Sequence, residues 1–145
     1  MGMFESQKRF VGELEANLMK ELEHTIQSFD FVLKDYVINK QLFRQGIDGD
    51  GVKLPGYKRT TIRYKIAKGD PTDRTTLRDD GDFYRHIEVT ATPQYFVVSS
   101  DVPYDDKIIK RYGKGVLKIT NENMREFMDA YFLPNLKEYV SDKMK

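Results

Sequence analysis

The chain has 145 residues, 39% hydrophobic and 32% charged, which is typical of a globular domain with a real core and excludes a disordered chain. Its 24 basic and 23 acidic residues nearly cancel, which argues against a dedicated nucleic-acid binder with a basic excess. The absence of cysteine excludes disulfides, thiolate metal sites and a cysteine nucleophile, and no window approaches 18 apolar residues, so no membrane span is expected.

The first third of the chain is predicted to be helical. Residues 4–27 carry apolar side chains at three-or-four-residue spacing with charged residues between them, which predicts an amphipathic helix. Apolar residues continue to position 43, so either one long helix bends near residues 28–30 or a second helix starts with Asp30 as its N-cap. Gly46 is predicted to end this helical part.

Turn-forming residues and one basic segment occupy residues 46–81. Residues 46–56 and 70–81 are rich in glycine, proline and aspartate and are predicted to be loops. Residues 57–69 predict a short helix that ends at Gly69, although their β-branched residues weaken it. We therefore predict a single domain over residues 1–145, in which residues 46–81 form an extended loop or assembly arm.

The hydrophobic period changes at residue 82. Residues 82–91 alternate as a strand does, and residues 95–100 are predicted to pair back as the second strand of a hairpin. A short helix over 104–113, a third strand over 115–120 and a terminal helix, capped by Thr120 or Asn121 and kinked by Pro134, are predicted to follow. The order predicts an α+β fold, with N-terminal and C-terminal amphipathic helices packed on a small antiparallel sheet built around a hairpin near residues 82–100.

The sequence GIDGDG, residues 46–51, looks like the opening of a calcium loop. With its last glycine as the sixth loop residue, Asp48 and Asp50 fall at ligand positions three and five. Position one is then Gly46 and position twelve is Tyr57, so both key ligands are missing. Because aspartate and glycine suit a tight turn, the stretch predicts a turn and not a metal site.

Carboxylates are dense between residues 79 and 106, and a metal-dependent nuclease would need such groups on adjacent strands. They are Asp79, Asp80, Asp82, Glu88, Asp101, Asp105 and Asp106. The last two fit the N-terminus of a helix, and the others fit solvated turns. The two histidines are far apart, and neither a nucleophile elbow nor a phosphate loop is present. We predict no catalytic residues, no metal ligands and no cofactor.

Basic and aromatic residues alternate over residues 57–68, which is the best candidate interaction surface. Its members are Tyr57, Lys58, Arg59, Arg63, Tyr64, Lys65 and Lys68. The basic groups could neutralise phosphates while the tyrosines stack on bases. A charged surface segment anchored by its aromatics, or contact with an acidic neighbouring subunit, explains the same pattern.

Two runs resemble a known family. Residues 41–89 and 102–123 resemble small structural proteins of tailed bacteriophages and prophages, in the virion-morphogenesis and tail-completion group of the head–tail junction. The residues that carry this resemblance are the Thr76–Phe83 segment that enters a strand and the Tyr104–Gly113 turn into a short helix. The family's usual Thr-Gly after the leucine is Asp80–Gly81 here. The resemblance covers about residues 40–125.

The resemblance implies a ring-forming tail-completion or neck protein that acts by assembly and not by catalysis. Such a protein is made in the host bacterial cytoplasm and carried in the virion. The implied partners are connector or tail-tube subunits and further copies of the chain, with DNA contact as a further expectation and no membrane. Two alternatives remain: a nucleic-acid-binding module that uses residues 57–68, and, less favoured, a metal-dependent nuclease that uses Asp79, Asp80, Asp82 and Asp101.

Overall fold

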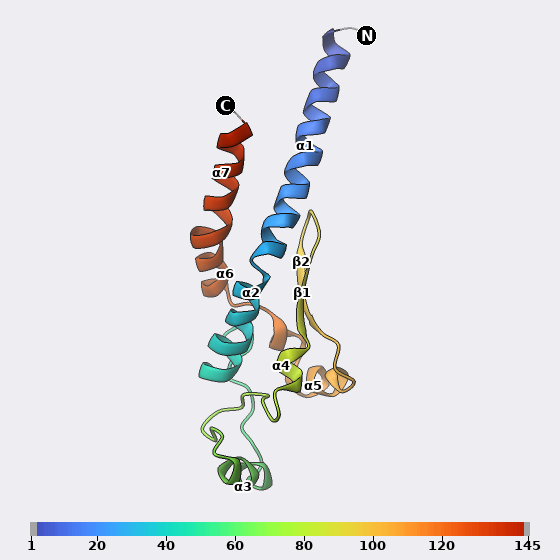
Figure 1. Ribbon diagram of the computed structural model, residues 1–145. Helices are drawn as coiled ribbons and strands as arrows, with labels where there is room; N and C mark the ends of the chain where they lie inside the picture. The colour runs from blue at the N-terminus through green and yellow to red at the C-terminus, as the bar shows by residue number, and fades with distance from the viewer. Residues whose placement is uncertain (1–2, 144–145) are drawn as a thin grey trace.

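A computed structural model describes residues 3–143 of the chain. Helix α1 (Met3–Ser28) runs along the upper half of the elongated molecule, beside the C-terminal helix α7 (Leu133–Lys143) (Figure 1). Thr25 on α1 donates a hydrogen bond to Asn135 on α7 at 2.9 Å, which fixes the two helices where they approach each other. Toward their free ends the helices diverge, and α1 runs past the tip of the β-hairpin.

The helical part continues after a break at Phe29. Helix α2 (Asp30–Asp35) is followed by the wider, π-type helix η1 (Tyr36–Gln45). The predicted second helix is confirmed, although Phe29 and not Asp30 occupies the N-cap position. Gly46 ends η1 in the left-handed region with φ 64°, as the sequence predicts.

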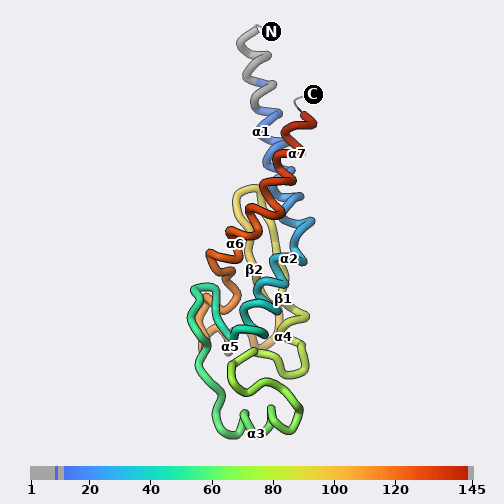
Figure 2. Tube along the Cα trace, turned by 90° about the vertical axis from the view of Figure 1, so that its left-hand side faces the viewer, coloured from blue at the N-terminus to red at the C-terminus, as the bar shows by residue number. Residues whose placement is uncertain are grey.

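Residues 46–81 form the lower tip of the molecule around the short helix α3 (Arg59–Lys68), which ends at the left-handed Gly69 (Figures 1 and 2). The two flanking loops are held within the chain. The Leu54 amide donates to the Gly46 carbonyl at 2.9 Å, and the Thr76 amide donates to the Tyr57 hydroxyl at 2.8 Å. Both bonds join residues of the segment itself, so the two loops are closed within residues 46–81.

The sheet consists of β1 (Ile87–Ala91) and β2 (Phe96–Ser100), paired antiparallel with Val89 opposite Val98. The predicted strand is wrong over its first half, because α4 (Asp82–Arg85) precedes β1. The Asp80 carboxylate accepts from the Asp82 amide at 2.9 Å, which favours a helical turn at that point.

Helix α5 (Asp105–Tyr112) follows the hairpin and matches the predicted short helix. The predicted third strand is wrong: η2 (Lys114–Leu117) is a 3₁₀ turn, in which the Val116 amide bonds back to the Gly113 carbonyl. Gly113 has a φ of 92°, which turns the chain out of an extended path before η2.

The C-terminal helical part consists of α6 (Asn121–Phe127), the π-type segment η3 (Met128–Phe132) and α7. Thr120 is the N-cap, because its hydroxyl accepts from the Asn123 amide at 3.2 Å. Pro134 lies in the first turn of α7 and has no N–H to donate to the turn before it. The wider η3 turn accommodates this missing hydrogen bond at the place where the sequence predicts a kink.

The core lies where α2, η1, the hairpin, η2 and α6 meet. Its most buried apolar side chains are Leu33, Val37, Leu42, Ile87, Val116 and Phe127. Helices α1 and α2 both pack on β1, so the predicted α+β fold of helices on a small hairpin sheet is confirmed. Within residues 3–143, no helix has the length and apolarity to cross a membrane.

Candidate functional site

The predicted interaction surface at residues 57–68 is divided between two sides of α3. Lys65 is buried, donates to the Arg78 carbonyl and lies 5.3 Å above the Tyr57 ring. Tyr57 faces the same way, since its hydroxyl accepts from the Thr76 amide. These two members of the predicted surface therefore anchor α3 to the domain and are turned away from a partner.

Two further members are engaged at the edge of α3. The Lys68 Nζ lies 2.6 Å from an Asp79 carboxylate oxygen, and the Tyr64 hydroxyl donates to the same oxygen at 3.1 Å. The hydrogen bond from Lys68 is the main cause that lowers the pKa of Asp79, and it raises the pKa of Lys68. Lys68 also lies over one face of the Tyr64 ring at 5.2 Å, while the Tyr64 side chain remains 51% exposed.

The remaining three members point outward. Lys58, Arg59 and Arg63 are exposed, and none has an ion pair with another of the described residues. The segment is thus a charged surface helix anchored by its aromatics, which was one of the explanations that the sequence left open. The part of the segment without ion pairs among the described residues is a patch formed by these three cations.

The segment that carries part of the phage resemblance is fixed by tyrosines. The buried Thr76 donates its amide to Tyr57 and accepts at its carbonyl from the Tyr84 hydroxyl. Burial raises the pKa of Tyr84 well above its usual range, so the hydroxyl stays protonated and donating at neutral pH. Leu77 follows with a φ of 58°, a strained left-handed conformation that this packing maintains.

The predicted turn at GIDGDG is confirmed. The Asp48 carboxylate accepts from the Asp50 amide at 2.9 Å and from the Val52 amide at 3.0 Å, which closes the loop on itself. Asp50 pairs with Lys118 at 2.7 Å. Both carboxylates therefore have structural partners within the chain.

Replacing Asp48 with alanine is expected to destabilise the chain by about 1 kcal/mol, because two loop amides lose their acceptor. Asp48→Asn keeps an acceptor oxygen and is expected to stay within about 0.5 kcal/mol of the natural chain. Urea denaturation of both variants checks this, and an equal loss in the two would show that the charge, and not the turn, is what matters.

Of the acidic residues considered for a nuclease, Asp79, Asp80 and Asp82 line one open pocket of about 460 Å³. Each already has a partner: Asp79 bonds Lys68, Asp80 accepts from the Asp82 amide and Asp82 pairs with Arg85. Over residues 3–143 no group of three or more histidine, aspartate or glutamate side chains is placed to hold a metal ion. The structure therefore gives the nuclease alternative no assembled centre.

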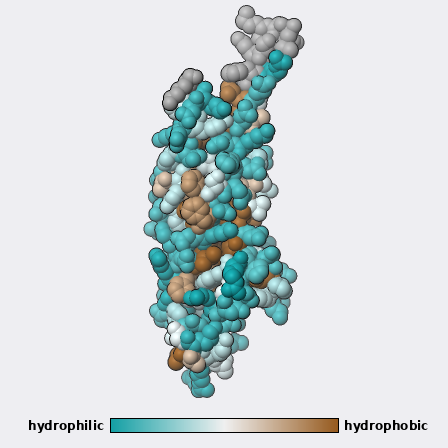
Figure 3. Space-filling view, viewed as in Figure 1, coloured by the Kyte–Doolittle hydropathy of each residue, from teal (hydrophilic) through white to brown (hydrophobic). Residues whose placement is uncertain are grey.

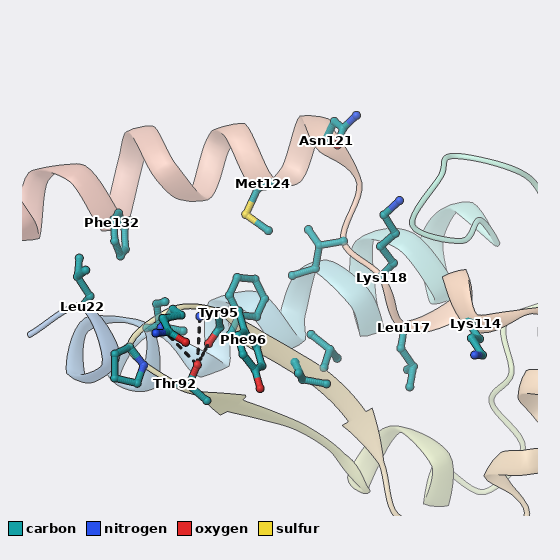
Figure 4. Close-up of a pocket in the computed structure, with 16 residues that line it drawn as sticks. Leu22, Thr92, Tyr95, Phe96, Lys114, Leu117, Lys118, Asn121, Met124 and Phe132 are labelled. Carbon is teal, nitrogen blue, oxygen red and sulfur yellow. Dashed lines mark hydrogen bonds between the residues drawn. The ribbon is translucent and has the colours of Figure 1, made fainter. Parts of the chain in front are cut away.

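Sequence reasoning missed an open apolar groove of about 680 Å³ between the hairpin, the C-terminal part of α1 and the α6–η3 helix (Figure 4). Its apolar lining includes Leu22, Ile26, Phe96, Val98, Met124 and Phe132. Figure 4 shows Met124 and Phe132 pointing from the upper helix toward Leu22 and the hairpin. The lining includes Lys114 and Lys118 and no carboxylate. No local motif could reveal this groove, because its walls are far apart in sequence.

A second apolar surface continues along α1 beyond the groove. Leu14 and Leu18 are 46% and 37% exposed, whereas Leu22, four residues further on, lines the groove. The helical spacing in the sequence identified this stripe as apolar but not as uncovered.

A scan of protein-family models, a search of curated proteins and a search of solved structures each found no match to the chain.

Proposed function

We propose that this protein is a structural subunit of the head–tail junction or tail of a tailed bacteriophage or prophage, which acts by assembly into a ring and not by catalysis. The observation that carries the proposal is the uncovered apolar stripe of α1, which diverges from its neighbour α7. Assembly would place such a surface against a partner.

Exposed apolar surface is spread over the long axis of the molecule. The large exposed apolar side chains include Leu14, Leu18, Met19, Phe31, Tyr95, Val97 and Val140. On the face in Figure 3, apolar side chains gather in the middle of the body among a largely hydrophilic surface. Contiguous apolar patches rimmed by polar groups are typical of interaction sites, and a ring subunit needs one on each side.

The phage setting rests on the resemblance of residues 41–89 and 102–123 to tail-completion proteins. In the fold these runs form η1, the α3 tip, α4, β1, α5 and η2. Helix α3 presents its three free cations at the end of the molecule opposite the free end of α1 (Figure 1). An elongated subunit with distinct ends suits a position between two other components of a neck.

Native mass spectrometry and light scattering test the proposal, from low micromolar to near-millimolar protein. We expect a discrete oligomer of many copies, seen as closed rings by negative-stain electron microscopy. Flanking portal, capsid and tail-tube genes are expected in the genome. A chain that stays monomeric alone and also with the products of its neighbouring genes would contradict the proposal.

The nucleic-acid alternative is favoured by one observation, the three exposed cations Lys58, Arg59 and Arg63 without carboxylate partners among the described residues. Such a patch can neutralise phosphates, and its binding must weaken as salt rises. The alternative requires a gel shift of duplex DNA that is lost when these three residues are changed to glutamine. Tyr57 is half-buried with Lys65 over its ring, so only the exposed Tyr64 is placed for base stacking.

A further inference from the structure

We infer that the exposed stripe of α1 in one copy docks into the apolar groove of the next copy, and that this head-to-tail contact builds the ring. The inference rests on the proposed function and names the surfaces that join its subunits. It commits to a second copy of this chain as the occupant of the groove.

The stripe has the form of a helical ligand. Leu14 and Leu18 are one helical turn apart, so they lie on one side of α1 and are both exposed. The N-terminal part of α1 extends past the hairpin tip, so a neighbouring molecule can approach it there (Figure 1). An amphipathic helix of this kind is recognised by laying such anchors into an apolar groove.

The groove has the size and lining to receive such anchors. About 680 Å³ lies within the range of sites that hold a ligand of several apolar groups. Phe96, Val98 and Met124 line it and are only half-buried, so apolar surface in the groove is left uncovered within one chain. The C-terminal part of α1 already forms one wall, through Leu22 and Ile26, so apolar helix packing is established there.

The charges beside the stripe of α1 favour a groove, and not a second stripe, as its binding partner. Residues 13–23 of α1 carry four glutamates against one lysine. Two stripes packed together would bring these glutamates close, and like charges at an interface disfavour pairing. The groove instead presents Lys114 and Lys118 without a carboxylate in its lining. Lys118 is paired with Asp50, whereas Lys114 has no ion pair with the described residues and is free to meet a glutamate.

The contact joins two unlike surfaces, and this determines the type of assembly. When the stripe of one copy binds the groove of the next, the first and last copies of the row each keep one surface unbound. One of these is a stripe and the other is a groove. Such head-to-tail contacts close into a ring when the rotation allows it and otherwise extend as a filament. The inferred contact therefore supplies both sides of a ring subunit.

Two single variants test the contact in the full-length chain. Leu18→Glu places a charge on the exposed stripe, and Met124→Glu places one in the groove, into which Met124 points from α6 (Figure 4). Each alone is expected to be monomeric by light scattering. An equal mixture is expected to form a 1:1 heterodimer and nothing larger, because one stripe and one groove remain intact between the two.

Ala16→Glu and Ser99→Glu are matched controls. Ala16 is exposed on the other side of α1, and Ser99 is exposed on the face of β2 that is turned away from Phe96 and Val98 and lies outside the groove. Both controls are expected to assemble as the natural chain does. Circular dichroism and the melting temperature confirm that all four variants are folded.

The outcomes separate this contact from the proposed function. If both test variants still assemble, the ring uses other surfaces and the groove contact is overturned while the proposed function stands. If Leu18→Glu is monomeric but Met124→Glu assembles, the stripe pairs with another stripe and the groove is again excluded. A natural chain that stays monomeric at near-millimolar concentration overturns the groove contact, and the proposed function then depends on assembly with neighbouring gene products.

Discussion

Replacing Gly49 with alanine is expected to destabilise the fold by about 3 kcal/mol, because overpacking against backbone has no flexible neighbour to relieve it. A Cβ at this position would overlap the carbonyl group and the Cβ of Lys118. The Gly49 amide also donates to the Gly115 carbonyl at 2.8 Å, so the turn and the η2 segment cannot separate without losing that bond. A shift of the urea midpoint toward lower concentration measures the loss.

Gly56→Ala is the matched control for Gly49→Ala. No atom lies within 4 Å of a Cβ built at Gly56, and its backbone is not in the left-handed region. This change is expected to leave stability unchanged or raise it by about 0.5 kcal/mol, because alanine restricts the unfolded chain. Equal urea midpoints for the two variants would show that the turn moves freely away from Lys118 and would refute the close approach.

Replacing Gln41 with leucine is the second change with a large expected effect, again a loss of about 3 kcal/mol. The Gln41 amide is fully buried and donates to the Lys118 carbonyl at 2.9 Å. Its oxygen accepts from the Thr120 amide and from the Asn123 side chain, both at 3.0 Å. Leucine fills similar space but leaves these three groups buried without a partner, and each such group costs about 1–3 kcal/mol, offset in part by apolar burial.

Gln45→Leu on the same helix η1 is the control, because Gln45 is exposed. It is expected to change stability by less than about 0.5 kcal/mol. Thermal and urea denaturation of the two variants check the difference. If Gln41→Leu is as stable as the natural chain, the buried amide contributes specificity of packing and no net stability.

Both sites fasten the same segment of the chain. Gly49 and Gln41 hold residues 115–120, and Leu117 and Ile119 in that segment line the apolar groove. Variants at either site are therefore expected to loosen the groove wall, so they are unsuitable for testing assembly. Leu18 and Met124, which make no hydrogen bond to residues 115–120 with their side chains, separate docking from folding.

The helices were the most predictable part of the structure. The apolar spacing over residues 4–27 predicted α1, and Gly46 and Gly69 marked the ends of η1 and α3 because only glycine enters the left-handed region readily. Thr120 was predicted as a cap from its side chain, and its bond to Asn123 confirms it. These features depend on neighbours a few residues away, which a sequence displays directly.

The two errors have different causes. Residues 82–85 alternate as a strand does, yet they form α4, and the Asp80 carboxylate accepts from the Asp82 amide in a local turn that the alternation masked. Residues 115–120 are β-prone, yet the approach of Gly49 and Gln41 holds them in a 3₁₀ turn and an extended link without a strand partner among the described residues. Propensity is a weak prior against such tertiary contacts.

By itself, the sequence determined the helical ends, the hairpin, the α+β class and the turn at GIDGDG, because each follows from local geometry and periodicity. Only the tertiary structure decided which apolar residues are covered: Leu14 and Leu22 belong to one stripe, but Leu22 lines a groove and Leu14 lies exposed. The tertiary structure also decided that the Lys65 side chain is buried while the Arg63 side chain is exposed to solvent. Burial depends on what packs across from a residue, and periodicity gives the direction of a side chain but not its neighbour.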